Sequence, residues 1–279
     1  MTKNKYFIHE KETAEILKAM RRISDGDYSV RLDSISPLSA EFNAMALKLE
    51  SDRNEQSALI SNTVHDLKSP ITAAAGFIDG ILDGTIPEEK RDHCLKIVSI
   101  ELKRMSRLAS CLSELSKIES GIRKFNFAPF DVAESARTVL ISLEQRINDK
   151  KLDIEFLSET DKMYAEADAD AIHEVMYNII ENAIKFSKDG GLLSVSIKSN
   201  DQKLLISIYN EGDGISPEDI PHVFDRFFRT ENSQRTDKSG SGLGMHIAKT
   251  VINAHGEQIQ AESEYGKNCC FSFTLKKSF

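Results

Sequence analysis

A heptad seam that occurs twice in succession constrains this chain more than any other feature. Apolar residues follow one another at alternating intervals of four and three, which keeps them on one face of an α-helix. The first seam is Ile60, Val64, Leu67, Ile71, Ala74, Ile78 and Ile81, and the second is Leu95, Val98, Leu102, Met105, Ala109 and Leu112. Between them lies Asp83-Gly84-Thr85-Ile86-Pro87, whose glycine and proline are typical of a turn. The sequence therefore predicts a helical hairpin.

The apolar stripe of this hairpin is too long for its two helices to bury alone. Two copies of the hairpin bury both stripes in a four-helix bundle, which predicts a homodimer. The alternative is a hairpin that packs inside a larger core of the same chain.

Composition narrows the class of protein. With 279 residues the chain exceeds a typical domain of ~150, so we expect more than one domain. The formal charge of −8 disfavours general nucleic-acid binding, which needs a clustered basic surface. No stretch reaches the ~18 apolar residues of a membrane span, and the start is too charged for a signal peptide, so the chain as written is expected to be cytoplasmic. Four cysteines without C-x-x-C spacing are expected to be reduced thiols.

The two parts that flank the hairpin have different patterns. The first ~50 residues predict two helices joined by an extended connector, the second continuing into the hairpin. After Gly121 the pattern predicts helices at 133–148, 171–186 and 243–254, and strands at 125–132, 152–157, 163–167, 193–198, 204–209, 258–263 and 270–275. This order indicates an α+β sandwich with one sheet covered by helices on one face.

Two glycine groups predict a phosphate-binding site. Asn210-Glu211-Gly212-Asp213-Gly214-Ile215 follows a predicted strand, and Ser239-Gly240-Ser241-Gly242-Leu243-Gly244 precedes a predicted helix. Glycine allows backbone N–H groups to approach a ligand closely, and a helix N-terminus favours anions. A P-loop is excluded by its missing motif, and Met245 in place of the last glycine disfavours a Rossmann fingerprint. The stretch from Arg229 to Ser241 has no large apolar side chain and is predicted to be a mobile lid.

One predicted helix face carries three polar residues. Asn178, Asn182 and Lys185 are spaced by four and three residues and share that face. Two amides and an ammonium suit hydrated Mg²⁺ and a polyphosphate. A solvated polar face is the alternative.

Five motifs, in order, resemble those of sensor histidine kinases. VHDLKSPIT resembles the H-box, NIIENAIKFS the N-box, NEGDGI the first Gly box, FDRFFR the F-box, and SGSGLGMHIA the second Gly box. The resemblance implies a multidomain chain, in which a HisKA-type dimerisation and phosphoacceptor hairpin (54–121) precedes a GHKL, or Bergerat-fold, ATP-binding domain (122–279) of the α/β sandwich type. Residues 1–53 resemble a HAMP signal-relay segment more loosely, because they lack its Glu-then-Gly signature.

The resemblance also implies roles for single residues of the hairpin. His65 is the implied phosphoacceptor, and Asp66 is the general base that holds its imidazole. Ser69 occupies the position of a water-orienting residue in members that also dephosphorylate their partner, and its hydroxyl leaves that activity open. Pro70 removes a helix hydrogen bond and is our hypothesis for a bending point.

For the ATP-binding domain, the resemblance implies ATP and Mg²⁺ as cofactors. Asn182 is the implied metal ligand. Asn210 replaces an Asp that reads adenine, and its amide oxygen can still accept from the adenine amino group. The residues implied to contact the nucleotide are Asn178, Asn182, Lys185, Asn210, Gly212, Gly214, Ile215, Phe228, Gly240, Gly242, Leu243 and Gly244. Residues 119–124, which include Gly121, are the predicted hinge.

The implied activity is ATP-dependent phosphorylation of His65, followed by transfer to an Asp of a response-regulator receiver domain. One alternative is a GHKL-type ATPase, which is disfavoured because Asn178 stands where such enzymes place a general-base Glu. A second is a pseudokinase that acts as a dimeric scaffold, for which the degenerate N-terminus and Asn210 leave room. Because HAMP-like segments usually follow a membrane helix, we expect either the cytoplasmic portion of a membrane sensor or a soluble sensor.

Overall fold

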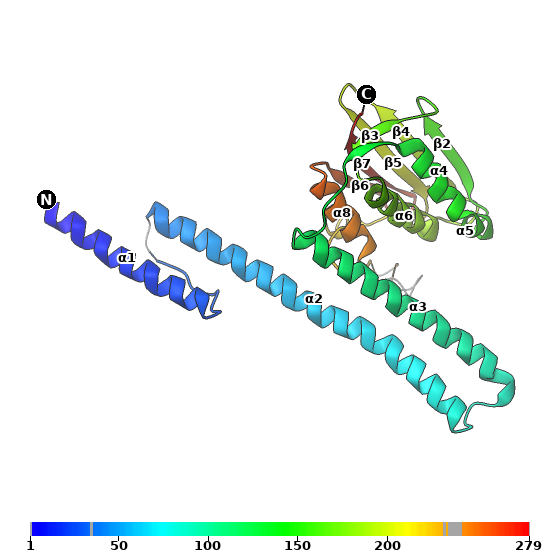
Figure 1. Cartoon of the computed structure of the whole chain (residues 1–279), viewed down its shortest axis with the longest axis horizontal. Helices are drawn as coiled ribbons and strands as arrows, with labels where there is room; N and C mark the ends of the chain where they lie inside the picture. Colours follow the sequence, from blue (N-terminus) through cyan, green and yellow to red (C-terminus); the bar gives the residue numbers. More distant parts are fainter. Residues whose placement is uncertain (1, 34–35, 231–232, 234–241, 279) are drawn as a thin grey trace. The chain divides into compact units, whose positions relative to one another are not determined.

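The structure is a computed structural model, which describes residues 2–33, 36–230, 233 and 242–278 (Figure 1). The chain forms two compact units, Met1–Ser69 and Pro70–Phe279. Throughout the described ranges, none of the helices combines the length and the apolar content that a membrane crossing requires.

The first unit is formed by α1 (Thr2–Ser24), a connector and the first part of α2 (Pro37–Leu82). Its small core is Ile16, Ala19, Val30, Phe42 and Ala46, with Ile23 and Leu32 packed against it. The Asn43 carboxamide accepts from the Leu32 N–H at 2.8 Å and donates to the Leu32 carbonyl at 2.9 Å. This pair of bonds satisfies one extended residue of the connector and holds it against α2.

Helix α2 has 46 residues and is uninterrupted from Pro37 to Leu82. The predicted continuation of the N-terminal helix into the hairpin is therefore confirmed. Pro70 lies within α2 without ending it, and its role as a bending point stays a hypothesis.

The predicted turn of the hairpin is confirmed between the end of α2 and α3 (Glu88–Glu119). The Asp83 carboxylate accepts from the Thr85 N–H at 2.8 Å, and Gly84 has a φ of 79°. Within the second unit, four large seam residues remain 41–53% exposed, namely Ile71, Ile78, Leu95 and Leu102. Their exposure agrees with the expectation that one hairpin cannot bury its own stripe.

The rest of the second unit is an α/β domain whose larger sheet has the strand order β2-β4-β5-β7-β6. Strands β2 and β4 run parallel, and the other neighbours run antiparallel. Helix α6 packs on β5, and α4 and α8 pack on α6 (Figure 1). The elements are α4 (Val132–Ser142), α5 (Glu144–Asp149), β2 (Asp153–Ser158), α6 (Ala169–Phe186), β4 (Leu192–Ser199), β5 (Lys203–Glu211), η1 (Ile220–His222), α8 (Gly244–Ala254), β6 (Ile259–Glu264) and β7 (Asn268–Lys276). The predicted fold class, a helical hairpin followed by an α/β domain, is confirmed.

Two details of the predicted domain are wrong. Strands β1 (Ala128–Asp131) and β3 (Tyr164–Ala167) form a separate antiparallel pair and do not belong to one common sheet. The predicted helix 133–148 is divided into α4 and α5 at Leu143. Leu143 is buried, so the break leaves the apolar pattern intact and gives no signal in the sequence.

The segment that follows α3 is attached to the α/β domain from Phe125 onward. The rings of Phe125 and Phe127 lie 4.8 and 4.9 Å from the imidazole of His255. The Asn126 N–H donates to the Asp168 carboxylate at 2.9 Å, and the Asp168 N–H donates to Nε2 of His255 at 3.2 Å. These contacts fix residues 125–127 on the domain.

Candidate functional site

His65 lies on an exposed face of α2, with 85% of its side chain accessible. Its Nδ1 is 3.5 Å from the carboxylate of Asp66, while Ser69 lies one turn later and is also exposed. The exposure of His65 agrees with its position beside the seam residue Val64. Because Asp66 approaches Nδ1, the other ring nitrogen, Nε2, is the one that a reactant can reach.

The three polar residues predicted on one helix face belong to α6. This helix starts at the N-cap Asp168, whose carboxylate accepts from the Ala171 N–H at 3.0 Å. Its buried residues form a single apolar stripe: Ala171, Ile172, Val175, Met176, Ile179, Ile180, Ala183 and Ile184. Asn178, Asn182 and Lys185 are half-buried beside this stripe. No hydrogen bond found among the described residues uses the carboxamide of Asn178 or Asn182, so both can bind a ligand.

The second glycine group meets this polar face at the start of α8. A Cβ added to Gly244 would lie 3.4 Å from Oδ1 of Asn178. Leu243 is fully buried and anchors the first turn of α8. The N-terminus of α8, which favours anions, is therefore adjacent to the Asn178 side chain. Gly240, also predicted for this group, lies outside the described residues, as does most of the predicted lid.

The first glycine group is packed between the end of α6 and the β6–β7 turn. A Cβ on Gly212 would lie 2.0 Å from the Phe186 carbonyl oxygen, and one on Gly214, whose φ is 63°, would lie 2.5 Å from the Glu264 carbonyl oxygen. The Ile215 N–H donates to the Ser263 hydroxyl at 2.7 Å. Only glycine fits at positions 212 and 214, because the obstacles are backbone atoms.

Asn210 lies at the end of β5, between Leu193 of β4 and Cys269 of β7, and is 2% exposed. None of the hydrogen bonds within the described parts of the chain involves its carboxamide. Its carboxamide is therefore available to a polar ligand group, and the buried position of the side chain strengthens such a hydrogen bond.

The aromatic residues around Phe228 form the turn that precedes the second glycine group. Phe224 is buried and packs edge-on against Phe271, with 5.9 Å between the ring centres. The ring centres of Phe228 and His222 are 5.7 Å apart. Phe227 has a φ of 60°, and a Cβ on Gly242 would lie 2.7 Å from the Phe227 carbonyl carbon. A bulky residue at positive φ is strained, and Gly242 allows the chain to pass it closely.

Arg226 binds the end of α3, a contact that the sequence did not predict. Its guanidinium donates to the Glu119 carboxylate at 2.5 Å and, through Nε, to Nε2 of His246 at 3.1 Å. Nδ1 of His246 contacts the Phe224 carbonyl at 2.9 Å. Burial lowers the pKa of His246, and the charge of Arg226 acts in the same direction. Arg226 belongs to FDRFFR, the motif that resembles the F-box, and the structure places its guanidinium on Glu119.

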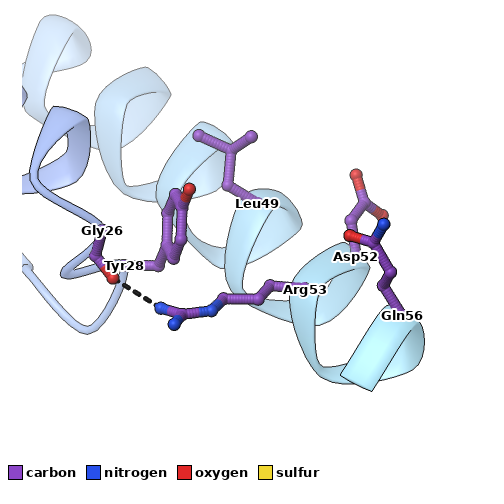
Figure 2. A pocket seen from close by; sticks show the side chains of 6 residues that line it. All are labelled: Gly26, Tyr28, Leu49, Asp52, Arg53 and Gln56. Carbon is purple, nitrogen blue, oxygen red and sulfur yellow. Dashed lines mark hydrogen bonds between the residues drawn. The ribbon is translucent and has the colours of Figure 1, made fainter. Parts of the chain in front are cut away.

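A cavity of about 400 Å³ in the first unit is lined by Gly26, Tyr28, Leu49, Asp52, Arg53 and Gln56 (Figure 2). The Arg53 side chain extends to the Gly26 carbonyl, which it binds at 2.6 Å, and its guanidinium lies 5.3 Å from the centre of the Tyr28 ring. Asp52 and Gln56 point away from this contact (Figure 2). None of the predicted site residues lines the cavity, which belongs to the packing of the connector on α2.

Two family models match the chain. Residues 55–121 match the His Kinase A (phospho-acceptor) domain, and residues 167–278 match the histidine kinase-, DNA gyrase B-, and HSP90-like ATPase domain. The first match contains His65, and the second contains α6 and both glycine groups.

Comparisons with known proteins identify relatives of the same kind. The sensor histidine kinase YclK of Bacillus subtilis (strain 168) is 30% identical over 280 residues, covering 96% of this chain and 59% of YclK. The solved structure of the Acinetobacter baumannii histidine kinase AdeS is 28% identical with a TM-score of 0.64, covering 77% of this chain and 98% of AdeS. The histidine kinase ThkA, in its complex with the response regulator protein TrrA, has a TM-score of 0.63 at 24% identity, covering 83% of this chain and 66% of ThkA, and shows the fold alone.

The chain spans between 37% and 59% of the length of the curated relatives that it matches. Within that span lie a helical hairpin that matches the phospho-acceptor model and carries the exposed His65, and an α/β domain that matches the ATPase model. The chain therefore belongs to the sensor histidine kinase family of two-component systems.

Proposed function

We propose that this chain transfers the γ-phosphoryl group of ATP to His65 and then to an Asp of a response-regulator receiver domain. The observation that carries the proposal is the exposed His65 imidazole with the Asp66 carboxylate at its Nδ1. An imidazole that must act as a nucleophile near neutral pH needs one accessible unprotonated nitrogen, and a carboxylate at Nδ1 favours the tautomer that provides it at Nε2.

The first step forms an N–P bond and breaks a P–O bond. The Nε2 lone pair attacks the γ-phosphorus, and ADP leaves with the electrons of the broken bond. Positive charge then develops on the ring, and Asp66 stabilises it and accepts the Nδ1 proton as general base. In the second step, Asp66 returns the proton to Nδ1, the receiver carboxylate attacks the phosphorus, and the neutral imidazole leaves with the electrons of the broken N–P bond.

ATP and Mg²⁺ fit the residues that are present. The carboxamide oxygen of Asn182 is a hard ligand of the kind that Mg²⁺ accepts, and we assign the metal to it. Asn178 and Lys185 are assigned to the phosphates, and Asn210 to the adenine amino group. Bound Mg²⁺ neutralises part of the phosphate charge.

The remaining nucleotide contacts are assigned to the two glycine groups and the aromatic turn. These residues are Gly212, Gly214, Ile215, Phe228, Gly240, Gly242, Leu243 and Gly244. The tight approaches at positions 212, 214 and 242 support this assignment for the described members of the groups.

The proposed partners are a second copy of the chain and a receiver domain. Exposed seam residues on α2 and α3 support the homodimer, and a response regulator bound to ThkA supports the receiver domain. We assign 54–121 to dimerisation and phosphotransfer, 122–279 to ATP binding, and 1–53 to a HAMP-like relay.

The proposal is tested by incubating the full chain with Mg²⁺ and γ-labelled ATP. We expect acid-labile label on the wild-type protein and none on His65→Gln. His93→Gln is the matched control, because His93 is another exposed histidine of the hairpin. Release of free phosphate without labelled protein would support the ATPase alternative. The absence of both labelled protein and free phosphate would support the scaffold alternative.

Dephosphorylation of the receiver is the second proposed activity, assigned to Ser69. Its hydroxyl lies one helical turn from His65, where it can orient a water molecule. Ser69→Ala is expected to slow the loss of phosphate from the receiver and to leave labelling of His65 unchanged. Equal dephosphorylation rates for the wild type and the variant would remove Ser69 from this role.

A further inference from the structure

Lys150 lies outside every nucleotide-binding motif, yet it binds the end of α6. It follows α5, and its ammonium donates to the Lys185 carbonyl at 2.6 Å and to the Ser187 carbonyl at 2.7 Å. Its own carbonyl accepts from the Gly190 N–H at 2.9 Å. One residue therefore holds both the last turn of α6 and the turn that follows it.

The same end of α6 contacts the first glycine group. Ser187 forms a β-bridge with Gly212, and the Lys188 N–H donates to the Glu211 carbonyl at 3.0 Å. Gly212 is so close to the Phe186 carbonyl that a Cβ would lie 2.0 Å from its oxygen. Residues 186–188 are therefore the junction between the helix that carries Asn182 and the loop that carries Gly212 and Gly214.

The charge of Lys150 suits this junction. The last carbonyls of a helix lack partners within the helix and carry partial negative charge, which a cation stabilises. Burial lowers the pKa of Lys150, while the carboxylates of Asp189 and Asp213 act in the opposite direction and favour the charged form. Two charge-assisted hydrogen bonds from one ammonium restrain both carbonyls at once.

We propose that Lys150 is a positioning residue, which keeps the phosphate-binding face of α6 and the adenine-binding loop in register. This inference rests on the proposed function, because it assumes that ATP lies across the junction. It assigns to Lys150 no contact with the nucleotide.

A positioning role differs from a general structural role in how it affects different ligands. ATP contacts both sides of the junction at once, so its affinity depends on their register. Adenosine contacts the adenine-binding loop alone. Its affinity should therefore change little when the junction between the loop and α6 is loosened. A general loss of stability would instead weaken both ligands in the same proportion.

The experiment compares Lys150→Met with Lys150→Arg and Lys198→Met in the full chain. Lys198→Met is the matched control, because Lys198 is an exposed lysine of β4 in the same domain. Dissociation constants for ATP with Mg²⁺ and for adenosine are obtained by displacement of the fluorescent analogue TNP-ATP. For Lys150→Met we expect ATP to bind about tenfold more weakly and adenosine to change by less than about twofold. Lys150→Arg retains the donors and should remain within about twofold of the wild type for both ligands.

Three outcomes overturn the inference. The positioning role is removed if Lys150→Met binds ATP as tightly as the wild type does, or if the variant loses affinity for ATP and adenosine equally. If Lys150→Met does not unfold cooperatively, Lys150→Gln takes its place. Its carboxamide is uncharged and its side chain is one bond shorter, so it cannot restore both charge-assisted bonds and should show the same selective loss for ATP. A wild-type chain that binds neither ligand overturns the proposed function, and this inference with it.

Discussion

The Arg226 guanidinium donates to the Glu119 carboxylate at 2.5 Å, joining residues 107 positions apart in the sequence. Glu119 is the last residue of α3, and Arg226 also donates to His246 of α8. Both side chains of the ion pair are partly exposed. The contact therefore holds the end of the hairpin on the ATPase-type domain with the modest strength of a screened ion pair.

Glu119→Gln is expected to accelerate the labelling of His65. If the ATP-binding domain swings about residues 119–124, this ion pair opposes its departure from α3. A partly exposed pair contributes up to ~1 kcal/mol, which corresponds to a rate increase of up to about fivefold. Initial rates with γ-labelled ATP provide the measurement, and the advantage of the variant should disappear at high salt. A slower variant would show that the contact supports the reaction.

Gly212→Ala and Gly76→Ala should change stability in opposite directions. A Cβ at position 212 meets the Phe186 carbonyl, so we expect a loss of ~2 kcal/mol together with weaker ATP binding. At position 76, within α2, nothing lies within 4 Å, and alanine should contribute ~0.5 kcal/mol through its helix propensity. Thermal unfolding of both variants checks the pair. If Gly212→Ala left the thermal stability unchanged, the first glycine group would have to be able to move away from α6.

His246 is expected to make stability depend on pH. Its pKa in the folded state lies below the ordinary 6.5, with burial as the main cause, while the Phe224 carbonyl and Glu119 act in the opposite direction. At pH values between the pKa of His246 in the folded state and 6.5, the unfolded chain binds more protons than the folded chain does. The free energy of unfolding therefore falls as pH decreases through this range, and the contribution of His246 is complete above it.

Urea unfolding of the wild type and His246→Gln at pH 5.5 and 7.5 measures this effect. The wild type should lose more stability than the variant on acidification, whereas His93→Gln should behave as the wild type does. Parallel losses in all three proteins would exclude His246 as the source.

Asn182→Ala is expected to reduce the labelling of His65 by about 100-fold or more, because the proposed metal ligand is lost. Its thermal midpoint should stay close to that of the wild type, since the half-buried carboxamide has no hydrogen-bond partner in the described ranges. Asn182→Asp retains an oxygen ligand and should keep more activity. In the wild type, removal of Mg²⁺ by a chelator should stop labelling. Labelling by Asn182→Ala at the wild-type rate would move the metal to another residue.

Local patterns predicted α6, because its apolar stripe runs along the whole helix. The stripe of α6 places Asn178 and Asn182 together whatever the rest of the fold does. By contrast, a helix break at the buried Leu143 leaves the periodicity unchanged. The pairing of β1 with β3 depends on partners that sit far from each other in the sequence, so the prediction of one common sheet failed.

The contacts of Lys150 and Arg226 were not predictable from local patterns. Lys150 binds carbonyls that lie 35 and 37 positions away in the sequence. These are backbone groups, which every residue has, so residue types do not indicate which carbonyls Lys150 binds. Arg226 occurs in a recognisable motif, but its partner Glu119 is one of many acidic residues on α3. Only the folded arrangement selects that one.

The attachment of residues 125–127 to His255 and Asp168 leaves a short tether of residues 120–124 between the hairpin and the ATP-binding domain. Five residues span at most about 17 Å, so a nucleotide held by the domain stays close to the hairpin to which the domain is joined. Its effective concentration there is of the order of millimolar, whatever the concentration of the protein. Phosphorylation of His65 within an assembled dimer should accordingly be first order, with a rate constant that does not change on dilution until the dimer itself dissociates.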